Sequence, residues 1–563
     1  MLILGINPGS HDSAACVVSD GVVVAAVEEE RFTRRKHAMG EMPWNATRYC
    51  LGQAEVTLDD IDYVAICWAG PGQPENSVRF FDEAHVQKHE GFYRNKLFPK
   101  SYFGTSSLPP MVHVSHHLAH AASAYRCSPF EEAAVLVVDG QGESVSTSIA
   151  HGHDGRIKFI SQFGIQHSLG YFYQAVTDYL GLGSLSGEGK TMALAAYGDA
   201  RFDFPEFSLL NDGYSVAAPE PANEDATRAM LEFWQFRLRA RFGTHRIPPR
   251  TDDRSRPCFL EFGTPEWDIA ASSQAQLEHV LIHLASLALR WTSSKNLVLS
   301  GGVALNCAAN GKIAKATGAE LFIFPAAGDA GAAVGAAIEV SAELGAKAAR
   351  PFRHPFLGPS FTTDAIERIL GEEQVPYTVC SDKEVAELIA AGHTVGWFQG
   401  RAELGPRALG HRSILADPRS ATIRDHVNAV KRRERWRPFA PSVTKEAATE
   451  LLGRDVISPY MLLAVPVLAA QQERIAAAVH VDGTARPQTV DAVEEPLYHG
   501  LLEACRRLIG VAAVLNTSFN DESEPMVCTP REALRTYLST GLDYLIMGPF
   551  AVGPKEHMRK SAP

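Results

Sequence analysis

Residues 1–27, MLILGINPGSHDSAACVVSDGVVVAAV, set the pattern of the fold. Leu2 to Asn7 is an apolar run that ends in a polar loop with a glycine, which predicts a buried strand. Ala14 to Val18 and Val22 to Val27 flank an Asp-Gly pair, a strong short-range signal for a hairpin turn. We therefore expect a buried strand, a glycine loop and a hairpin at the start of the chain.

Two later segments repeat the arrangement of a strand followed by a glycine loop. Ala134–Val138 runs into DGQGE at residues 139–143, and Leu297–Leu299 runs into SGGVALN at residues 300–306. Helical stretches such as Ser273–Thr292 separate these strands. Strands and helices that alternate in this way predict an α/β (α+β) fold.

The length of 563 residues exceeds what one core usually supports, so we expect two large domains. A proline-containing stretch of weak periodicity, residues 345–359, precedes a new α/β pattern. We therefore predict a first domain over 1–345, a linker over 346–359 and a second domain over 360–563. Residues 201–256, rich in Pro, Asp and Arg, are expected to form an irregular insertion.

Charge and cysteine content restrict the class of protein. With 53 Lys and Arg against 65 Asp and Glu, the net charge of −12 should repel nucleic acid and anionic lipid. The nine cysteines are scattered and form no CxxC pair, which favours a reducing compartment. The first residues lack a basic signal-peptide region. We expect a cytoplasmic protein with neither a nucleic-acid nor a membrane partner.

Two histidines and two aspartates are candidates for a metal site. His116 and His120 are four residues apart, so they share one face if the segment is helical. Asp139 and Asp329 each follow an apolar segment and adjoin glycines. Two imidazoles and two carboxylates suit iron, zinc or manganese better than magnesium or calcium. The alternatives are a structural histidine cluster and aspartates that act as turn or N-cap residues.

Two further segments of the first domain are candidates for nucleotide binding and proton transfer. GSLSGEGKT at residues 183–191 resembles a P-loop, but its glycine spacing is one residue too long and a helical stretch precedes it. Glu188 and Lys190 could still meet a nucleotide, or the turn could simply be exposed. His11, on the loop after the first strand, could take a proton from a hydroxyl near neutral pH, or be a structural histidine.

The second domain contains a reversal of charge. Residues 401–437 carry ten Arg and Lys against four Asp and Glu, in a chain that is acidic overall. Glycines, prolines and aromatic residues interrupt this run, which favours a site for several phosphates over a solvated face. Its members, with polar residues that follow later strands, are Arg401, Arg407, Arg412, Lys431, Arg432, Arg437, Arg486, Asn516 and Ser518.

A set of ordered fragments resembles one known family. The fragments are GINPGSHDSAACVVSDG, EEERFTRRKH, HHLAHAASA, VVDGQGE, GEGKTMALAAYG, LSGGVALNC, GRAELGPRALGHRSILADPR, RERWRPFAPS, DGTARPQTV and NTSFN. In this order, over nearly the whole chain, they resemble the nodulation-protein-U type carbamoyltransferases. That family includes enzymes that carbamoylate antibiotics and nodulation factors.

The resemblance implies both architecture and chemistry. It implies an N-terminal domain like those of actin, heat-shock ATPases and sugar kinases (ASKHA), and a C-terminal YrdC-like domain. The second domain would form carbamoyladenylate from carbamoyl phosphate and ATP, which enters with Mg2+. The first would hold a divalent metal, usually Fe(II), and transfer the carbamoyl group to a small-molecule alcohol, a natural product or antibiotic.

The resemblance also assigns roles to individual residues. His116, His120, Asp139 and Asp329 match the metal ligands, and His11 matches the base beside the acceptor hydroxyl. Gly301, Gly302 and Asn306 match part of the adenosine site, with Glu188 and Lys190 nearby. The carbamoyl phosphate and ATP site would contain Arg401, Arg407, Arg412, Lys431, Arg432, Arg486, Asn516 and Ser518.

Two other functions remain open at this point. A tRNA threonylcarbamoyl enzyme would combine the same two related domains, although the net charge of −12 and the absence of a basic tail argue against it. A non-catalytic ATP-binding module of the actin-like superfamily would need neither the basic segment nor His11.

Overall fold

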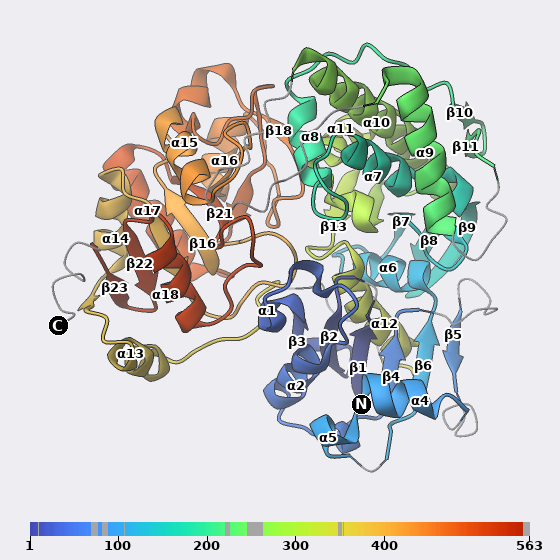
Figure 1. Cartoon of the computed structure of the whole chain (residues 1–563), viewed down its shortest axis with the longest axis horizontal. Helices are drawn as coiled ribbons and strands as arrows, with labels where there is room; N and C mark the ends of the chain where they lie inside the picture. The colour runs from blue at the N-terminus through green and yellow to red at the C-terminus, as the bar shows by residue number, and fades with distance from the viewer. Residues whose placement is uncertain are drawn as a thin grey trace. The chain divides into compact units, whose positions relative to one another are not determined.

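The computed structural model describes residues 1–9, 11–68, 77–81, 88–105, 107–219, 226–244, 263–346, 352 and 354–554. The described residues divide into two compact units, one ending at Phe352 and the other starting at His354. Each unit has a mixed α/β fold built on β-sheets with helices packed against them (Figure 1). Of the predicted linker, residues 347–351 and 353 lie outside the described residues.

The first sheet of the first unit confirms the predicted strand and hairpin. Its strands are β1 (Leu2–Asn7), β2 (Ala14–Ser19), β3 (Val22–Glu28), β4 (Tyr63–Ile66), β5 (Val78–Phe80) and β6 (Met111–Val114). Their order is β3-β2-β1-β4-β6-β5. Strand β2 is antiparallel to both β1 and β3, whereas β4 and β6 run parallel to β1. These strands appear in blue in Figure 1.

The second sheet repeats this topology. Its strands are β7 (Ala133–Val138), β8 (Val145–His153), β9 (Arg156–Gly164), β12 (Asn296–Ser300) and β13 (Glu320–Ile323). In the order β13-β12-β7-β8-β9, an antiparallel hairpin again lies on one side of the first strand and two parallel strands on the other. The loop after β1 in the first sheet and the loop after β7 in the second therefore occupy equivalent positions in the same strand topology.

Two helices at the centre of the first unit connect these sheets. Helix α12 (Asp329–Glu343) packs against β1, β2 and α6 (His116–Tyr125). Gly335 allows this close approach, because a Cβ built there would lie 1.8 Å from the carbonyl oxygen of Ala119. The first turns of α6 and α12 each begin with a predicted metal ligand.

Other helices cover the sheets of the first unit. They are α1 (Glu30–Thr33), α2 (Trp44–Gln53), α4 (Glu90–Phe92), α5 (Lys100–Phe103), α7 (Leu169–Tyr179), α8 (Glu188–Ala195), α10 (Thr264–Thr292) and α11 (Cys307–Thr317). Helix α10 contains the predicted helix and begins nine residues before it, at Thr264. No strand precedes GSLSGEGKT directly, because α7 comes before it, as predicted.

The prediction that residues 201–256 are irregular is wrong for most of the described part of that range. The segment forms a hairpin of β10 (Phe207–Leu210) and β11 (Gly213–Val216), followed by the helix α9 (Ala226–Phe242). Trp234 of α9 stacks on Phe207, with ring centroids 5.4 Å apart, so aromatic contacts fix both elements. Residues 220–225 and 245–262 lie outside the described residues.

The second unit is built on one eight-stranded sheet, in the order β14-β23-β22-β15-β16-β21-β17-β20. The strands are β14 (Thr378–Val379), β15 (Val395–Phe398), β16 (Arg412–Ala416), β17 (Ala440–Thr444), β20 (Gln488–Val490), β21 (Ala513–Ser518), β22 (Tyr544–Met547) and β23 (Phe550–Val552). A separate short pair joins β18 (Val465–Pro466) to β19 (Thr484–Ala485).

Helices cover both faces of this sheet, because alternate strand residues enter two different cores. Trp397 and Leu415 belong to one core, and Phe398 and Ile414 to the other. The first core contains α14 (Asp382–Ala390), α16 (Lys445–Leu452) and α17 (Pro496–Ile509). The second contains α13 (Thr363–Glu372), α15 (Ala421–Val430) and α18 (Pro530–Ser539).

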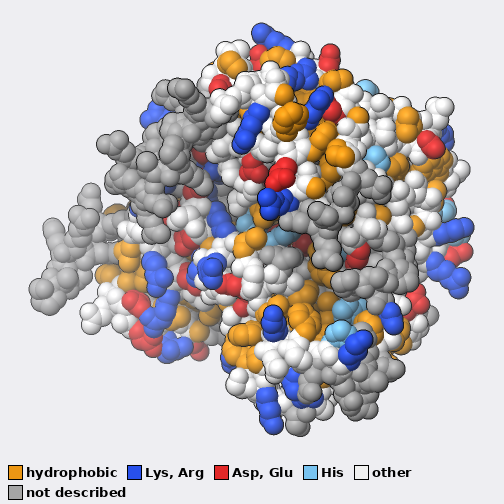
Figure 2. All heavy atoms as spheres, turned by 45° about the vertical axis from the view of Figure 1, so that its right-hand side comes forward, with side chains coloured by type: hydrophobic (Ala, Val, Ile, Leu, Met, Phe, Trp, Pro, Cys, Tyr) orange, Lys and Arg blue, Asp and Glu red, His pale blue; other side chains and the backbone are white. Residues whose placement is uncertain are grey.

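Acidic and basic side chains are interspersed over the surface seen in Figure 2. Among the residues that the structure describes, no helix is both long enough and apolar enough to span a bilayer.

Candidate active site

Four predicted ligands converge inside the first unit. His116 and His120 lie on α6, Asp139 follows β7, and Asp329 is the first residue of α12. We call these four residues the tetrad. Nε2 of His116 lies 3.2 Å from Oδ2 of Asp139 and 3.4 Å from Oδ1 of Asp329. Nε2 of His120 lies 3.4 Å from each of the same two oxygens, and 3.1 Å from Nε2 of His116.

The hydrogen bonds behind the histidines fix which nitrogen faces the centre of the tetrad. Nδ1 of His116 lies 3.2 Å from the carbonyl oxygen of Cys67, which can only accept, so Nδ1 carries the proton. Nδ1 of His120 lies 3.3 Å from Oγ of Ser300. Because the Ser300 hydroxyl donates to the Ala327 carbonyl oxygen, its Oγ accepts from His120, and Nδ1 of His120 carries the proton as well. Both Nε2 atoms therefore face the two carboxylates, as in a metal site with oriented ligands.

The tetrad is buried and strongly polarised. His116 and His120 are fully buried, and Asp139 and Asp329 nearly so. Burial disfavours every charged form, but the opposite charges outweigh it, so the pKa of His116 lies well above its usual value. The pKa values of both Asp139 and Asp329 are lowered for the same reason. Two carboxylates held ionised in the interior create a strong demand for positive charge.

A divalent metal fits this arrangement. Ligand atoms about 2.0–2.1 Å from a shared tetrahedral centre lie about 3.3–3.4 Å from one another. The five distances given above, which involve the histidine nitrogens, are 3.1–3.4 Å, and all four ligand atoms lie within 4.8 Å of one another. The donor set of two imidazoles and two carboxylates suits iron, zinc or manganese.

Neighbouring groups hold the tetrad in place. The backbone N–H of Gly302 donates to Oδ1 of Asp139 at 2.9 Å, which leaves Oδ2 for the centre. Glu143 accepts from the backbone N–H of His116 at 3.0 Å and so ties the DGQGE loop to the start of α6. Trp68 stacks on the His116 ring, with centroids 3.9 Å apart. The middle histidine, His117, points elsewhere and lies 2.7 Å from Oγ of Ser148.

His11 lies beside the tetrad. Its Nε2 is 3.7 Å from Oδ2 of Asp329, and its Nδ1 is 3.2 Å from Oδ2 of Asp12. The side chain is 34% exposed, so a substrate hydroxyl could reach it. Burial lowers the pKa of His11, but the charges of Asp329 and Asp12 outweigh it and raise the pKa to about 10. A cation bound to Asp329 would cancel the charge that contributes most to this rise.

The nucleotide-binding candidates of the first unit form two groups. Gly301, at φ 90°, and Gly302 lead from β12 past Asp139, and a Cβ on Gly301 would lie 2.2 Å from the Val138 carbonyl oxygen. The Asn306 side chain caps α11 and exchanges hydrogen bonds with Gln274. Glu188 accepts from the Leu185 N–H at 3.0 Å, and burial raises its pKa. Lys190 is buried two residues further along α8.

The predicted cations of the second unit differ in what they contact. Glu403 accepts from the backbone N–H groups of Leu409, His411 and Arg412, and so fixes the loop before β16. The Arg412 guanidinium is buried on the Phe398 ring and donates to four carbonyl oxygens, those of Pro359, Gln399, Gly400 and His411. A phosphate contact would require Arg412 to give up these bonds.

Arg401 and Arg407 are half-buried on the same loop. Arg401 donates to the carbonyl oxygens of Leu357 and Gly358. After Arg407 the loop backbone is fixed, since Gln488 donates to the Leu409 carbonyl oxygen and Trp397 to that of Gly410.

The charges of two other arginines act on a third, Arg433. Burial lowers the pKa of Arg433, and the positive charges of Arg437 and Arg486 lower it further. Glu434 and Glu522 lie 3.8 Å and 3.7 Å from Arg437 and offset part of this charge. Arg432, by contrast, is exposed and donates to the Ser539 carbonyl oxygen. The structure thus groups Arg433, which is not among the residues predicted for this site, with Arg437 and Arg486.

Lys431 and the NTSFN segment form a closed network. The buried ammonium of Lys431 donates to the carbonyl and hydroxyl oxygens of Ser518 and to the backbone and side-chain oxygens of Asn520. Asn516 is buried as well, and its amide donates to Ala408 O, Ser442 Oγ and Gln488 Oε1. Ser518 is half-buried at the end of β21.

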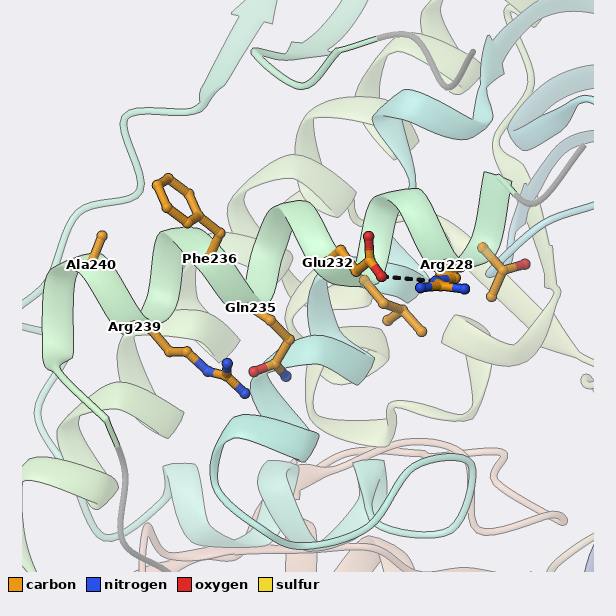
Figure 3. Close-up of a pocket in the computed structure, with 8 residues that line it drawn as sticks. Arg228, Glu232, Gln235, Phe236, Arg239 and Ala240 are labelled. Atoms are coloured by element: carbon orange, nitrogen blue, oxygen red, sulfur yellow. Dashed lines mark hydrogen bonds and ion pairs between the residues drawn. The ribbon is translucent and has the colours of Figure 1, made fainter. Parts of the chain in front are cut away.

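A surface recess of about 670 Å3 runs along α9, lined by residues such as Gln235, Phe236 and Arg239 (Figure 3). None of the predicted site residues lines it. Its walls carry one short ion pair, Arg228 with Glu232, and no convergent acid, base or metal ligand among the lining residues described. We therefore place the chemistry at the tetrad.

Comparison with known proteins decides the family. A model described as the carbamoyltransferase N-terminus matches residues 2–338, and one described as the carbamoyltransferase C-terminus matches residues 386–553. The chain belongs to the carbamoyltransferase family. Both units of this carbamoyltransferase are thus accounted for, and transfer of a carbamoyl group is its general activity.

Relatives of this carbamoyltransferase match nearly its full length. An uncharacterised protein of Synechocystis is 37% identical, covering 98% of this chain and 96% of its own. Nodulation protein NolNO of Sinorhizobium fredii is 37% identical, covering 97% and 79%. Nodulation protein U of the same organism is 29% identical, covering 92% and 94%.

Solved structures are more distant from this carbamoyltransferase. Full-length HypF in its phosphate- and nucleotide-bound form aligns with a TM-score of 0.36 and 15% identity, covering 62% of this chain and 56% of HypF. The activator of 2-hydroxyisocaproyl-CoA dehydratase from Clostridium difficile aligns with a TM-score of 0.33 and 14% identity, covering 61% and 95%.

Proposed function

We propose that this carbamoyltransferase is an ATP-dependent O-carbamoyltransferase that forms carbamoyladenylate and passes the carbamoyl group to the hydroxyl of a small molecule. The observation that carries the proposal is the tetrad with His11 beside it. A buried cation site next to an accessible imidazole supplies the two functions that attack of an alcohol on an acyl adenylate requires.

The proposal assigns activation to the second unit, as a YrdC-like domain. Carbamoyl phosphate and water release phosphate, and the carbamate oxygen attacks the α-phosphorus of ATP and displaces pyrophosphate. Fixed cations must recognise both anionic substrates, and Arg407, Arg437 and Arg486 are the candidates, while Mg2+ enters with ATP. Lys431 and Arg412 would act through the loops that they hold.

The proposal assigns transfer to the first unit, as a domain of the ASKHA type. The topology common to its two sheets supports this assignment. His116, His120, Asp139 and Asp329 would hold a divalent metal such as Fe(II), which when bound supplies positive charge for the adenylate phosphate. Gly301, Gly302 and Asn306, with Glu188 and Lys190, would contact the adenosine part.

His11 would receive the proton of the acceptor hydroxyl at Nε2 as the hydroxyl oxygen attacks the carbamoyl carbon. The bond from the carbamoyl carbon to the adenylate oxygen then breaks, and AMP leaves with that electron pair. The burial of the tetrad favours this reaction over hydrolysis, because little water can compete with the acceptor.

The test is incubation with ATP, Mg2+, carbamoyl phosphate and a panel of alcohols, including aminoglycosides, macrolides, β-lactams and simple glycosides. Mass spectrometry should detect an acceptor that has gained one carbamoyl group, and pyrophosphate release should require carbamoyl phosphate. Pyrophosphate release that is independent of carbamoyl phosphate would contradict the proposal. Binding of tRNA that weakens steeply with salt would instead support a nucleic-acid substrate.

A further inference from the structure

Asp12 and His37, near His11, form hydrogen bonds to each other through both the main chain and the side chains. Asp12 lies on the loop after β1, and His37 lies on the 3-10 turn Lys36–Ala38, 25 residues further along the chain. The Asp12 N–H donates to the His37 carbonyl oxygen at 2.7 Å. Nδ1 of His37 lies 2.7 Å from Oδ1 of Asp12.

Both residues have a backbone conformation that side chains disfavour. The φ angle is 51° at Asp12 and 62° at His37, in the left-handed region that glycine usually occupies. Such positions persist only where the surrounding structure holds them, and they concentrate at functional sites. Here two of them face each other beside the tetrad.

The Asp12 carboxylate determines the tautomer of both imidazoles. Its Oδ1 lies near Nδ1 of His37, and its Oδ2 lies 3.2 Å from Nδ1 of His11. An ionised carboxylate only accepts hydrogen bonds, so both Nδ1 atoms must carry protons. The lone pair of neutral His11 is then on Nε2, the nitrogen 3.7 Å from Asp329.

The other polar groups of the pair are also bonded. The His37 N–H donates to Oε2 of Glu30 at 2.6 Å, and its Nε2 lies 2.9 Å from Oγ of Ser186. The Asn7 amide donates to the carbonyl oxygens of both His11 and Asp12. Asp12 therefore has little freedom to rotate, and its carboxylate stays aimed at His11.

We infer that Asp12 and His37 are positioning residues for His11: His37 fixes the Asp12 carboxylate, and Asp12 orients the His11 ring with Nε2 free to accept the proton of the acceptor hydroxyl. The inference rests on the proposed role of His11 as the base. Neither Asp12 nor His37 needs to touch the acceptor.

Histidine nitrogen NMR tests the inference without a known acceptor. Full-length protein labelled with 15N at histidine and loaded with zinc is compared with four variants, and the His11 signals are assigned from His11→Asn. The wild type should show His11 protonated at Nδ1. In Asp12→Asn the new amide can donate to Nδ1, so the Nδ1–H signal should be lost and the Nε2–H tautomer should replace it.

The His37 variants provide a matched pair. The asparagine amide of His37→Asn stands where Nδ1 stood, so this variant should keep the Nδ1–H form of His11. His37→Gln places its amide near the Ser186 side and loses the Asp12 bond, so it should shift the tautomer as Asp12→Asn does. Ser186→Ala should leave it unchanged. Pyrophosphate release in every variant reports that the activating unit is intact.

The outcomes separate the two claims. A wild-type His11 that is doubly protonated, or protonated at Nε2, would remove the base role from the proposed function. An Nδ1–H form that survives unchanged in Asp12→Asn and His37→Gln would leave the base role standing and overturn the positioning role.

Discussion

The two units of this carbamoyltransferase use buried charge in different ways. In the first unit, two imidazoles and two carboxylates from three elements point at one centre, and their outer atoms are satisfied by Cys67, Ser300 and Gly302. In the second unit, Arg401, Arg412 and Lys431 donate mainly to backbone carbonyl oxygens.

The difference teaches that a cluster of charged residues is evidence for a site only when its polar atoms remain directed at a common point. The tetrad meets this condition, because each histidine directs its Nε2 at the centre. Arg412 and Lys431 do not, because the two terminal nitrogens of Arg412 and the ammonium of Lys431 are already bonded. Arg433 does not meet it either, because its guanidinium lies on the Phe439 ring and donates to the Asn428 side chain and to the Pro438 carbonyl oxygen. The charges of Arg437 and Arg486 lower the pKa of Arg433, so these two arginines lie near it.

Removing one tetrad ligand should give the largest effect and so test the first half of this comparison. Asp329→Ala is expected to lower bound metal and to slow carbamoyl transfer by on the order of a thousandfold, because several kcal/mol of charge stabilisation are lost. Elemental analysis and product formation measure the two effects. Pyrophosphate release should stay within a few-fold of wild type, since the second unit is unchanged.

The exposed Glu343 lies on the same helix and provides the control. Glu343→Ala should retain full metal and normal transfer. Full metal occupancy together with normal transfer in Asp329→Ala would mean that the convergent geometry of the tetrad does not correspond to a metal site.

The variant His11→Asn removes the proposed base but leaves the four proposed metal ligands in place. Asparagine can still donate to Asp12, so the loop should keep its conformation. Product formation should fall roughly a hundredfold, the usual contribution of a positioned base, while metal content and pyrophosphate release persist. Carbamoyladenylate should accumulate or hydrolyse, as quenched reactions would reveal. Normal turnover would exclude the base role of His11.

Local patterns explain how much of the fold and site the sequence could predict. The strand Leu2–Asn7 matches its prediction because an apolar run and an Asp-Gly turn act over a few residues. The tetrad could be predicted as a group since His116 and His120 share a helix face and both aspartates follow buried segments. Helix α9 is not predicted, because its many charged residues obscure the helical spacing of the buried positions Met230, Trp234 and Leu238.

The remaining features depend on contacts between distant segments. Nothing local marks His37 as the partner of Asp12, and the bond exists only because the chain returns to the β1 loop. The sequence also shows how many cations a segment contains, but not which carbonyl oxygens will accept hydrogen bonds from them. Arg412 and Arg407 are therefore equivalent candidates in the sequence alone. Arg432 has a φ of 53°, which turns the chain after α15 and sends neighbouring side chains in different directions.

Two arginine variants test whether any cation of the second unit remains available for phosphate. Arg407→Ala and Arg486→Ala should each lower carbamoyl phosphate-dependent pyrophosphate release roughly ten- to hundredfold, because a hydrogen bond to a charged group contributes about 1.5–3 kcal/mol. Arg432→Ala, which removes an exposed cation bonded to Ser539, is the matched control and should change the rate little. Equal rates in all three would place phosphate recognition elsewhere.

The smallest effect concerns Lys431, whose ammonium should act through the segment that it holds. Lys431→Met leaves the oxygens of Ser518 and Asn520 without their buried donor, which should destabilise the second unit by about 1–3 kcal/mol. Hydrogen exchange should therefore rise at the amides of residues 513–520, and denaturant unfolding followed by the same amides gives the free energy. The exposed Lys445 pairs with Asp491 at the surface, so Lys445→Met should cost no more than about 1 kcal/mol. The Lys431→Met protein could instead keep wild-type protection over β21 and lose pyrophosphate release. Lys431 would then be a direct phosphate ligand, and the buried charges of both units would be directed at a bound ion or substrate.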